Sequence, residues 1–420
     1  MNKPETESLR MLEMDPNEVR LDQIDVSQAE LFEHGAHWAY FERLRREDPV
    51  HYCANSEYGP YWSVTKFNDI TAVDGNHKVF SSEPTVTISE PSEEVPFQSF
   101  IQMDPPKHDV QRGAVQGVVA PRNLAALEET IRGWAGDILD DLPIGETFDW
   151  VPRVSVDLTA QMLATLFGVP FEDRLKLTYW SDIATGAPGL AGGNFVSEEE
   201  RTQGLNECLQ YFTQLWHERA EGPPSFDLIS MLAQSEKTRD MVSNPVEYLG
   251  NLILLLVGGN DTTRNSISSG VHALNQFPGE YEKLRNDPGL IPGMISEIIR
   301  WQTPVSSMSR RVKEDIELGG KQIRKGDKVV MWFISGNRDE EVIDRPNEFI
   351  IDRENPRHHL SFGFGIHRCM GNRAAEMQLR IVWEEISKRF SKIEVVGEPI
   401  RNRSNMIHGY NSLPVKVHPL

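Results

Sequence analysis

Residues 362–371 constrain this chain more than any other stretch. They read F-x-x-G-x-H-x-C-x-G, and apolar residues at helical spacing follow directly at Ala375, Leu379, Val382, Ile386 and Phe390. The glycines allow the backbone to turn tightly and to approach a flat partner closely. Cys369 therefore lies just before a helix N-terminus, where free N–H groups and the macrodipole favour a thiolate. The thiolate is the form of cysteine that binds metal.

A single cysteine with no partner nearby does not make a zinc site, which normally needs about four ligands. Cys369 can instead be the axial ligand of a haem iron, whose porphyrin supplies the in-plane ligands. The competing interpretation is a buried, inert cysteine in a glycine-rich turn, which is the common state of a free cysteine. The spacing favours the haem, because residues 362–371 resemble the haem-binding loop of the cytochrome P450 superfamily.

The resemblance extends over residues 30–420, with its motifs in the same order. It implies a mainly α fold with a small β region, the single-domain cytochrome P450 prism. We expect this haem domain to span residues 26–420, behind a flexible N-terminal tail of residues 1–25. The resemblance also implies haem b bound through Cys369, with O2 as co-substrate and electrons ultimately from NAD(P)H.

Composition excludes several other classes of protein. The mean hydropathy is −0.44, and the longest apolar run, Leu252–Val257, is far too short to span a membrane. Residues 1–30 lack the basic and then apolar order of a signal peptide. The net charge of −20 is unfavourable for nucleic-acid binding, and three scattered cysteines do not make a disulfide framework. We therefore expect a cytoplasmic protein without a transmembrane segment, and we expect it to be a monomer.

Two cationic side chains form a candidate anion site near residue 110. Pro106 suits a helix start, so His108 and Arg112 lie at i and i+4 on one helix face. On its own, this pair would be interpreted as solvated surface residues. The resemblance assigns it instead to a haem propionate, and arginine is well shaped to bind a carboxylate.

The same resemblance adds further cofactor contacts. It implies that Arg310 binds a second propionate, with Arg311 as the alternative if the register differs by one residue. His359 resembles a third propionate contact, and Phe362 opens the haem-binding loop.

A long helix is predicted between Pro245 and Phe277, because Asn244-Pro245 is a strong start signal and Pro278-Gly279 a strong stop. Such a helix would be about 50 Å long and would cross the domain. Its interior contains Gly258-Gly259, and each glycine costs about 1 kcal/mol relative to alanine. A packing or functional reason should offset that cost.

The residues around the two glycines suit a flat cofactor. A missing side chain at Gly258 leaves room, and the Thr262 hydroxyl can bond back to the helix and bend it. The alternative is a kinked core helix with a polar patch. Residues 258–262 resemble the oxygen-activation motif of the family, which implies that Asp261 and Thr262 are catalytic residues that relay protons.

Glu297 and Arg300 stand at i and i+3 on a predicted helix, where an exposed pair contributes only a few tenths of a kcal/mol. The resemblance joins them to Arg353 as structural support for the haem-binding loop. It also places four residues around the substrate: Leu254, Val257, Val305 and Met308. A loop at residues 185–194 resembles a mobile lid, although a plain surface loop is an equal interpretation.

The resemblance implies monooxygenation of an unactivated C–H bond. Residues 103–112 and 258–266 look like the bacterial alkane-hydroxylating branch, which oxidises the terminal methyl group of medium-chain n-alkanes and related aliphatic chains. The small or apolar pocket residues also admit a terpene, a sterol or a fatty acid.

A haem-binding sensor without turnover is a further alternative, but Asp261 and Thr262 argue against it, since a sensor needs no proton relay. No flavin or iron–sulfur motif is present. We therefore expect a separate ferredoxin and ferredoxin reductase to donate electrons.

Overall fold

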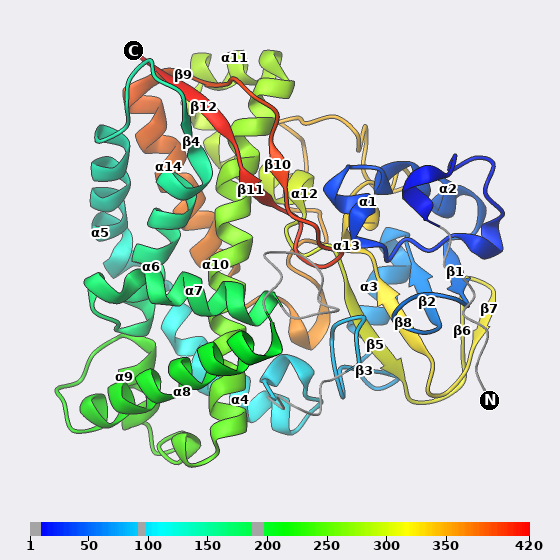
Figure 1. The fold of residues 1–420 in the computed structure, drawn as a ribbon, viewed down its shortest axis with the longest axis horizontal. Coiled ribbons are helices and arrows are strands. Elements are labelled where there is room, and N and C mark those ends of the chain that lie inside the picture. The colour runs from blue at the N-terminus through cyan, green and yellow to red at the C-terminus, as the bar shows by residue number, and fades with distance from the viewer. Residues whose placement is uncertain (1–9, 91–97, 187–196) are drawn as a thin grey trace.

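Helices make up most of the structure, a computed structural model that describes residues 10–90, 98–186 and 197–420. Figure 1 shows the longer helices gathered in one half of the molecule, opposite α1–α3 and most of the strands. The helices are α1 Ala29–Glu33, α2 His37–Glu47, α3 Phe67–Gly75, α4 Lys107–Val115, α5 Pro121–Asp140, α6 Asp157–Phe167, α7 Arg174–Thr185, α8 Glu198–Ala220, α9 Leu228–Gln234, α10 Pro245–Gln276, α11 Pro278–Asn286, α12 Ile291–Gln302, α13 Phe333–Gly336 and α14 Asn372–Arg389. The predicted mainly α fold with a small β region is confirmed.

The largest sheet has the strand order β1-β2-β8-β5-β3, in which only the β2–β8 pair is parallel. A three-stranded antiparallel sheet has the order β4-β12-β9, and β6–β7 and β10–β11 are two-stranded pairs. The strands are β1 Val50–Cys53, β2 Tyr61–Val64, β3 Phe80–Ser81, β4 Phe148–Asp149, β5 Met308–Val312, β6 Ile316–Leu318, β7 Lys321–Ile323, β8 Lys328–Met331, β9 Phe390–Val395, β10 Ile400–Arg401, β11 Tyr410–Ser412 and β12 Pro414–Pro419.

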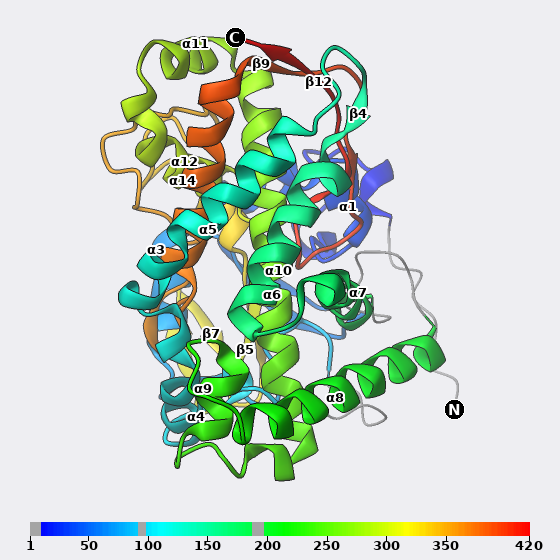
Figure 2. The ribbon, with the colours of Figure 1, turned by 90° about the vertical axis from the view of Figure 1, so that its left-hand side faces the viewer.

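Helix α10 runs through the middle of the helical half in both views (Figures 1 and 2). It begins at Pro245 as predicted and ends at Gln276, one residue before the predicted end, but the Asn244 side chain makes no capping hydrogen bond. The first half of α10 packs with α7–α9 in one apolar cluster, and the second half packs with α12 and α14 in another. None of the helices within the described residues has the length and apolar character needed to cross a membrane.

The predicted flexible tail of residues 1–25 is wrong for residues 10–25. Met11, Val19 and Ile24 are buried together with the first helices and the large sheet. The Tyr40 hydroxyl also donates a hydrogen bond to the Met11 carbonyl at 2.6 Å. These apolar side chains are too widely spaced to show a pattern in the sequence, and burial comes from the partners they meet. Residues 1–9 lie outside the described part.

Helix α14 follows residues 362–371, as predicted, and an ion cluster ties it to α5. Glu385 is nearly buried and accepts hydrogen bonds from Lys388, Arg132 and Arg389 at 2.6–3.0 Å. Burial alone would raise the pKa of Glu385, but these hydrogen bonds outweigh it and lower the pKa to about 2. The ionised carboxylate therefore stabilises the folded state.

The pH dependence of stability should report this cluster. Because the folded pKa of Glu385 lies below the usual value of 4.5, its contribution is present above pH 4.5 and is lost as the pH falls towards 2. We expect Glu385→Gln to lower the free energy of unfolding at pH 7 by about 1–3 kcal/mol. Urea unfolding at pH 7 and pH 4 measures the effect, which should be smaller at pH 4. An equal loss at both values would contradict the assignment.

Candidate functional site

A cavity of about 290 Å³ lies between α10, the loop that carries Cys369 and the start of β5. It brings together segments that are far apart in the sequence, from Asp74 to Ile407. The wall contains all four residues predicted to surround a substrate, together with Gly258, Thr262, Phe362 and Cys369. Most of the remaining wall is aliphatic or aromatic.

The Cys369 thiol faces this cavity. Cys369 lies inside the fold, and the part of its surface that protein atoms leave uncovered faces the cavity. Gly363 and Gly365 adopt left-handed φ values of 66° and 64°, which favour glycine, and the Cys369 N–H donates to the Phe362 carbonyl at 2.8 Å. The loop therefore holds the sulfur at the cavity wall.

From the sequence, the helix N-terminus is expected to lower the pKa of the Cys369 thiol, but the pKa is raised. Burial raises the pKa of Cys369, and the backbone N–H of Gly371 and the Arg112 guanidinium only partly oppose this effect. The helix N-terminus alone does not make a thiolate here. A bound metal cation would supply the missing stabilisation, since a coordinating thiol is deprotonated by the metal charge.

The two adjacent glycines of α10 have different roles. A Cβ added at Gly258 would meet no atom within 4 Å, whereas one at Gly259 would lie 2.7 Å from Leu163 Cδ2. Gly258 therefore leaves open space in the cavity wall, and Gly259 permits close helix packing. The Thr262 hydroxyl donates to the Gly258 carbonyl at 2.7 Å, which is the predicted back-bond.

Asp261 lies apart from Thr262. Its carboxylate is buried outside the cavity wall, where it pairs with Arg264 Nη2 at 2.7 Å and accepts from the Ser181 hydroxyl at 3.3 Å. Burial raises the pKa of Asp261, and Arg264 lowers it only in part. The expected relay would therefore join two side chains that point in different directions, and in this structure only Thr262 reaches the cavity.

Cationic side chains gather at one edge of the cavity. Arg112 and Arg310 line it, and Arg112 Nη2 donates to the Arg368 carbonyl at 2.5 Å. His108 packs edge-on against His367 at 4.5 Å between ring centroids. His108 Nε2 and both ring nitrogens of His367 are buried and have no hydrogen-bond partner within the described residues. Such groups are costly to bury unpaired, so this edge suits an anionic ligand.

His359 does not belong to this edge. It is buried outside the cavity wall, its ring packs near Phe362, and its Nδ1 accepts from the Ser361 N–H at 3.3 Å. His367 lines the cavity instead, and burial lowers its pKa to about 2, so its ring is neutral. The sequence carried a signal for His367, since it stands two residues before the cysteine within the motif itself.

The donor set fits a haem. A thiol faces the cavity on one side, open space lies beside Gly258, and unpaired donors and arginines stand at one edge, where carboxylates of a haem would be bound. The described residues contain no group of three or more His, Cys, Asp or Glu side chains that could hold a metal ion. The residues that could hold a haem here are Cys369, Gly258, Phe362, His108, Arg112, Arg310 and His367.

The three residues predicted to support the loop form a buried network with one another. Arg300 binds the Glu297 carboxylate through two hydrogen bonds of 2.7 and 2.8 Å, and both side chains are fully buried. Arg353 adds two hydrogen bonds of 3.1 Å to the same carboxylate. Burial alone would raise the pKa of Glu297, but Arg300 and then Arg353 outweigh it and lower the pKa.

Residues 98–102, here called the wall segment, close another side of the cavity with Phe100 and Ile101. The Phe100 N–H donates to Asn251 Oδ1 at 3.0 Å, and Asn251 Nδ2 donates to Gln111 Oε1 at 2.8 Å. One buried amide of α10 thus links the wall segment to α4. The predicted lid at residues 185–194 lies almost entirely outside the described residues.

Gly250→Ala should disturb the wall segment. A Cβ at this position would lie 2.2 Å from the Gln98 carbonyl oxygen, so backbone must move. We expect the free energy of unfolding to fall by about 1–3 kcal/mol, as in other overpacked sites. Gly133→Ala is the matched control, because its Cβ would meet no atom within 4 Å and should stabilise α5 slightly. Denaturant unfolding of both variants measures the difference, and equal stabilities would refute the close packing.

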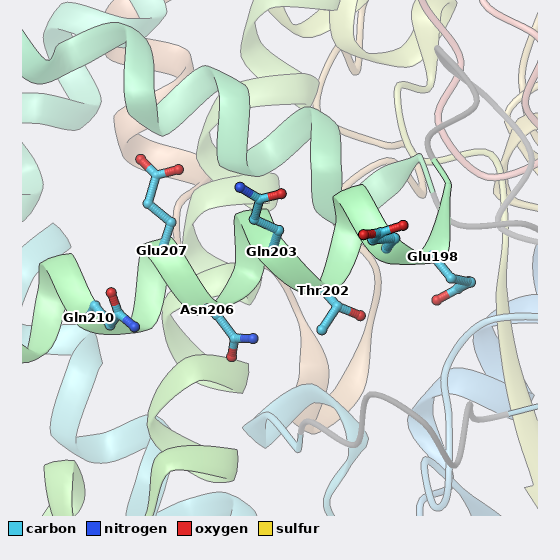
Figure 3. A pocket seen from close by; sticks show the side chains of 7 residues that line it. Glu198, Thr202, Gln203, Asn206, Glu207 and Gln210 are labelled. Atoms are coloured by element: carbon cyan, nitrogen blue, oxygen red, sulfur yellow. The ribbon is translucent and has the colours of Figure 1, made fainter.

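A second hollow lies along the outer side of α8 (Figure 3). It is lined by polar side chains of that helix alone, including Glu198, Gln203 and Glu207. It brings no distant segments together and holds no candidate catalytic group, so it is not the site.

Comparisons with known proteins agree with this geometry. A family model described as Cytochrome P450 matches residues 289–413. The solved structure of cytochrome P450-153 from Novosphingobium aromaticivorans has a TM-score of 0.87 and 42% identity, covering 94% of this chain and 99% of that chain. Linalool 8-monooxygenase of Pseudomonas putida is 34% identical over 95% of this chain and 100% of its own length. A methyl-branched lipid omega-hydroxylase of Mycobacterium tuberculosis is 32% identical over 89% and 90%.

Proposed function

Since the chain belongs to the cytochrome P450 family and is a monooxygenase, we propose that it hydroxylates the terminal carbon of medium-chain n-alkanes or related aliphatic chains. The family implies a haem ligated by a cysteine thiolate, and we propose Cys369 as the ligand. When bound, the haem activates O2 so that one oxygen atom enters a C–H bond. The residues of this chain bind and orient the substrate, exclude water and supply protons.

The distribution of charge in the cavity wall carries the substrate proposal. The charged wall residues are Asp74, Arg112 and Arg310. Asp74 and Arg112 are hydrogen-bonded to the Cys369 loop, and Arg310 is hydrogen-bonded to Asp74. The rest of the described wall is mostly aliphatic and aromatic, with a few hydroxyl groups and the side chains of His367, Cys369 and Gln378. A neutral hydrocarbon chain loses nothing on entering such a space, whereas a carboxylate placed there would lose its hydration without gaining a cation.

Two relatives support an aliphatic substrate and a terminal position. The lipid omega-hydroxylase acts, by its name, on the end of a chain. The other relative acts, by its name, on linalool, which is an acyclic molecule. The linalool enzyme also makes a terpene the main alternative. We propose haem b as the cofactor and NAD(P)H as the ultimate electron source, through a separate ferredoxin and ferredoxin reductase. Exposed Arg368 and Arg373 flank Cys369 and suit an acidic donor.

An optical titration of the purified holoprotein tests the substrate proposal. We expect n-octane to shift the haem spectrum from low to high spin, because an alkane bound in the apolar space would exclude water from it. Octanoate at pH 7 should produce a much smaller shift, since the arginines of the described wall, Arg112 and Arg310, are already hydrogen-bonded to the Arg368 carbonyl and to Asp74. A linear terpene alcohol is the third ligand. A larger shift with the terpene or with octanoate than with n-octane would overturn the alkane assignment.

Thr262→Ala should separate proton supply from substrate binding. Thr262 lines the cavity together with Thr263 and Ser266 of α10, and its hydroxyl is hydrogen-bonded to the Gly258 carbonyl. We expect product formed per NAD(P)H consumed to fall about tenfold or more, as for loss of a proton-transfer group, while the n-octane spectral shift is retained. Thr262→Ser keeps the hydroxyl and is the control. Full coupling in Thr262→Ala would exclude this role.

A further inference from the structure

Asp74 is a buried carboxylate in the cavity wall for which the sequence motifs suggest no role. It is the second-last residue of α3, a helix about 290 positions before the Cys369 loop, and only 4% of its surface is exposed. A buried carboxylate is costly unless it is paired and hydrogen-bonded. The hydrogen bonds and the ion pair of the Asp74 carboxylate therefore indicate its role.

The two oxygens of Asp74 bind two different parts of the haem cavity. Arg310 Nη2 donates to Oδ1 at 2.6 Å, and both side chains of this ion pair are almost fully buried. The Phe364 N–H, within the Cys369 loop, donates to Oδ2 at 2.7 Å. One carboxylate thus connects a candidate propionate-binding arginine to the loop that carries the sulfur.

Two glycines of the Cys369 loop, Gly363 and Gly365, pack closely against Asp74. A Cβ at Gly363 would lie 3.2 Å from Asp74 Oδ2, and a Cβ at Gly365 would lie 2.5 Å from the Asp74 carbonyl oxygen. Both glycines already require left-handed φ angles. The loop therefore turns directly against the end of α3, with Asp74 as the point of contact.

We propose that Asp74 is a positioning residue that anchors the Cys369 loop to α3 and places a fixed negative charge at the edge of the haem cavity. Arg310 shares its guanidinium between this charge, the Ser309 carbonyl and any haem carboxylate, so Asp74 offsets the positive charge that Arg310 brings to this edge. The inference concerns the haem environment and does not depend on which substrate is oxidised.

Two substitutions separate the charge of Asp74 from its hydrogen bonds. Asp74→Asn removes the charge and leaves an oxygen that can still accept from the Phe364 N–H. Asp74→Ala removes both functions. Asp69→Asn is the matched control, because Asp69 stands on the same helix and makes no hydrogen bond with the loop in the described structure. The three variants and the wild type are compared as ferric holoproteins.

The first readout is the midpoint reduction potential of the haem. We expect both Asp74 variants to have a higher potential than the wild type, because a nearby negative charge stabilises the more positive ferric form. The second readout is the rate of haem transfer to excess apomyoglobin. It should rise about tenfold in Asp74→Ala, which leaves the Phe364 N–H unpaired, and less in Asp74→Asn.

If Asp74 has a purely structural role, the reduction potential of Asp74→Asn will equal that of the wild type. That result would refute the proposal that the charge of Asp74 acts on the haem. An equal shift in Asp69→Asn would show a general surface effect and overturn the specific assignment. If Asp74→Ala does not fold, the anchoring is supported and Asp74→Asn still tests the charge. None of these outcomes depends on alkane binding, so failure of the substrate proposal would be visible separately in the n-octane titration.

Discussion

Cys369→Ser should abolish monooxygenase activity and the carbon monoxide difference spectrum that is characteristic of thiolate-ligated haem. Serine is similar in size to cysteine, so the loop and its hydrogen bond to Phe362 can persist. Its hydroxyl would not supply the thiolate ligand on which the oxygen chemistry of such a haem depends. We expect product formation to fall by on the order of a thousandfold or more, equivalent to about 4 kcal/mol of activation free energy.

Cys208→Ala is the control for this substitution. Cys208 is buried in the apolar cluster of α7–α9, away from the cavity, and burial raises its pKa far above the usual value. Its loss should leave the difference spectrum intact and cost only a little stability. A thiolate-type spectrum that survives in Cys369→Ser would show that another cysteine is the ligand and would refute the site.

Arg300→Leu should prevent formation of a stable holoprotein. The substitution leaves the Glu297 carboxylate fully buried with Arg353 as its remaining cation. It also leaves three backbone carbonyls without the Arg300 guanidinium, those of Asn337, Pro346 and Glu348. Breaking a buried ion pair in this way costs about 3–5 kcal/mol, which is a large part of the stability of a typical domain.

Thermal unfolding and the haem content of the purified protein measure the loss of stability in Arg300→Leu. Arg324→Gln is the control, because its pair with Asp315 is exposed on both sides and should contribute about 0–1 kcal/mol. Arg300→Lys should have an unfolding temperature between those of Arg300→Leu and the wild type. Lysine keeps the positive charge but cannot make both hydrogen bonds to the Glu297 carboxylate. If Arg300→Leu unfolds at the same temperature as Arg324→Gln, the network is not a folding element.

Local patterns predicted several elements correctly. The limits of α10 follow from proline at its start and Pro278-Gly279 at its end, and α14 follows from apolar residues spaced at 3.6 positions. These signals are local, because caps, breakers and helical periodicity act within a few residues of the backbone that they control. The same kind of signal failed for residues 10–25, whose burial depends on distant partners.

The candidate site was predicted less completely. Cys369, Gly258, Thr262 and the four apolar wall residues were named from motifs, and the structure places all of them at the cavity. His359 was predicted as a propionate contact, but the structure places His367 and not His359 in the cavity wall, and of the predicted relay pair Asp261 and Thr262 only Thr262 lines the cavity. A helix face is wide, and one-dimensional spacing does not decide which side chain reaches a cavity and which turns into the neighbouring helix.

The sequence by itself determined the chemistry that the chain can carry: a lone cysteine in a glycine turn before a helix, and a long helix interrupted by Gly258-Gly259. Only the tertiary structure decided what surrounds those groups. It buried Glu297 with Arg300 and Arg353, turned Asp261 towards Arg264, and brought Asp74 to Arg310 and Phe364. The physical reason is that burial strengthens or penalises each charge according to its partners, and those partners come from segments that no local pattern connects.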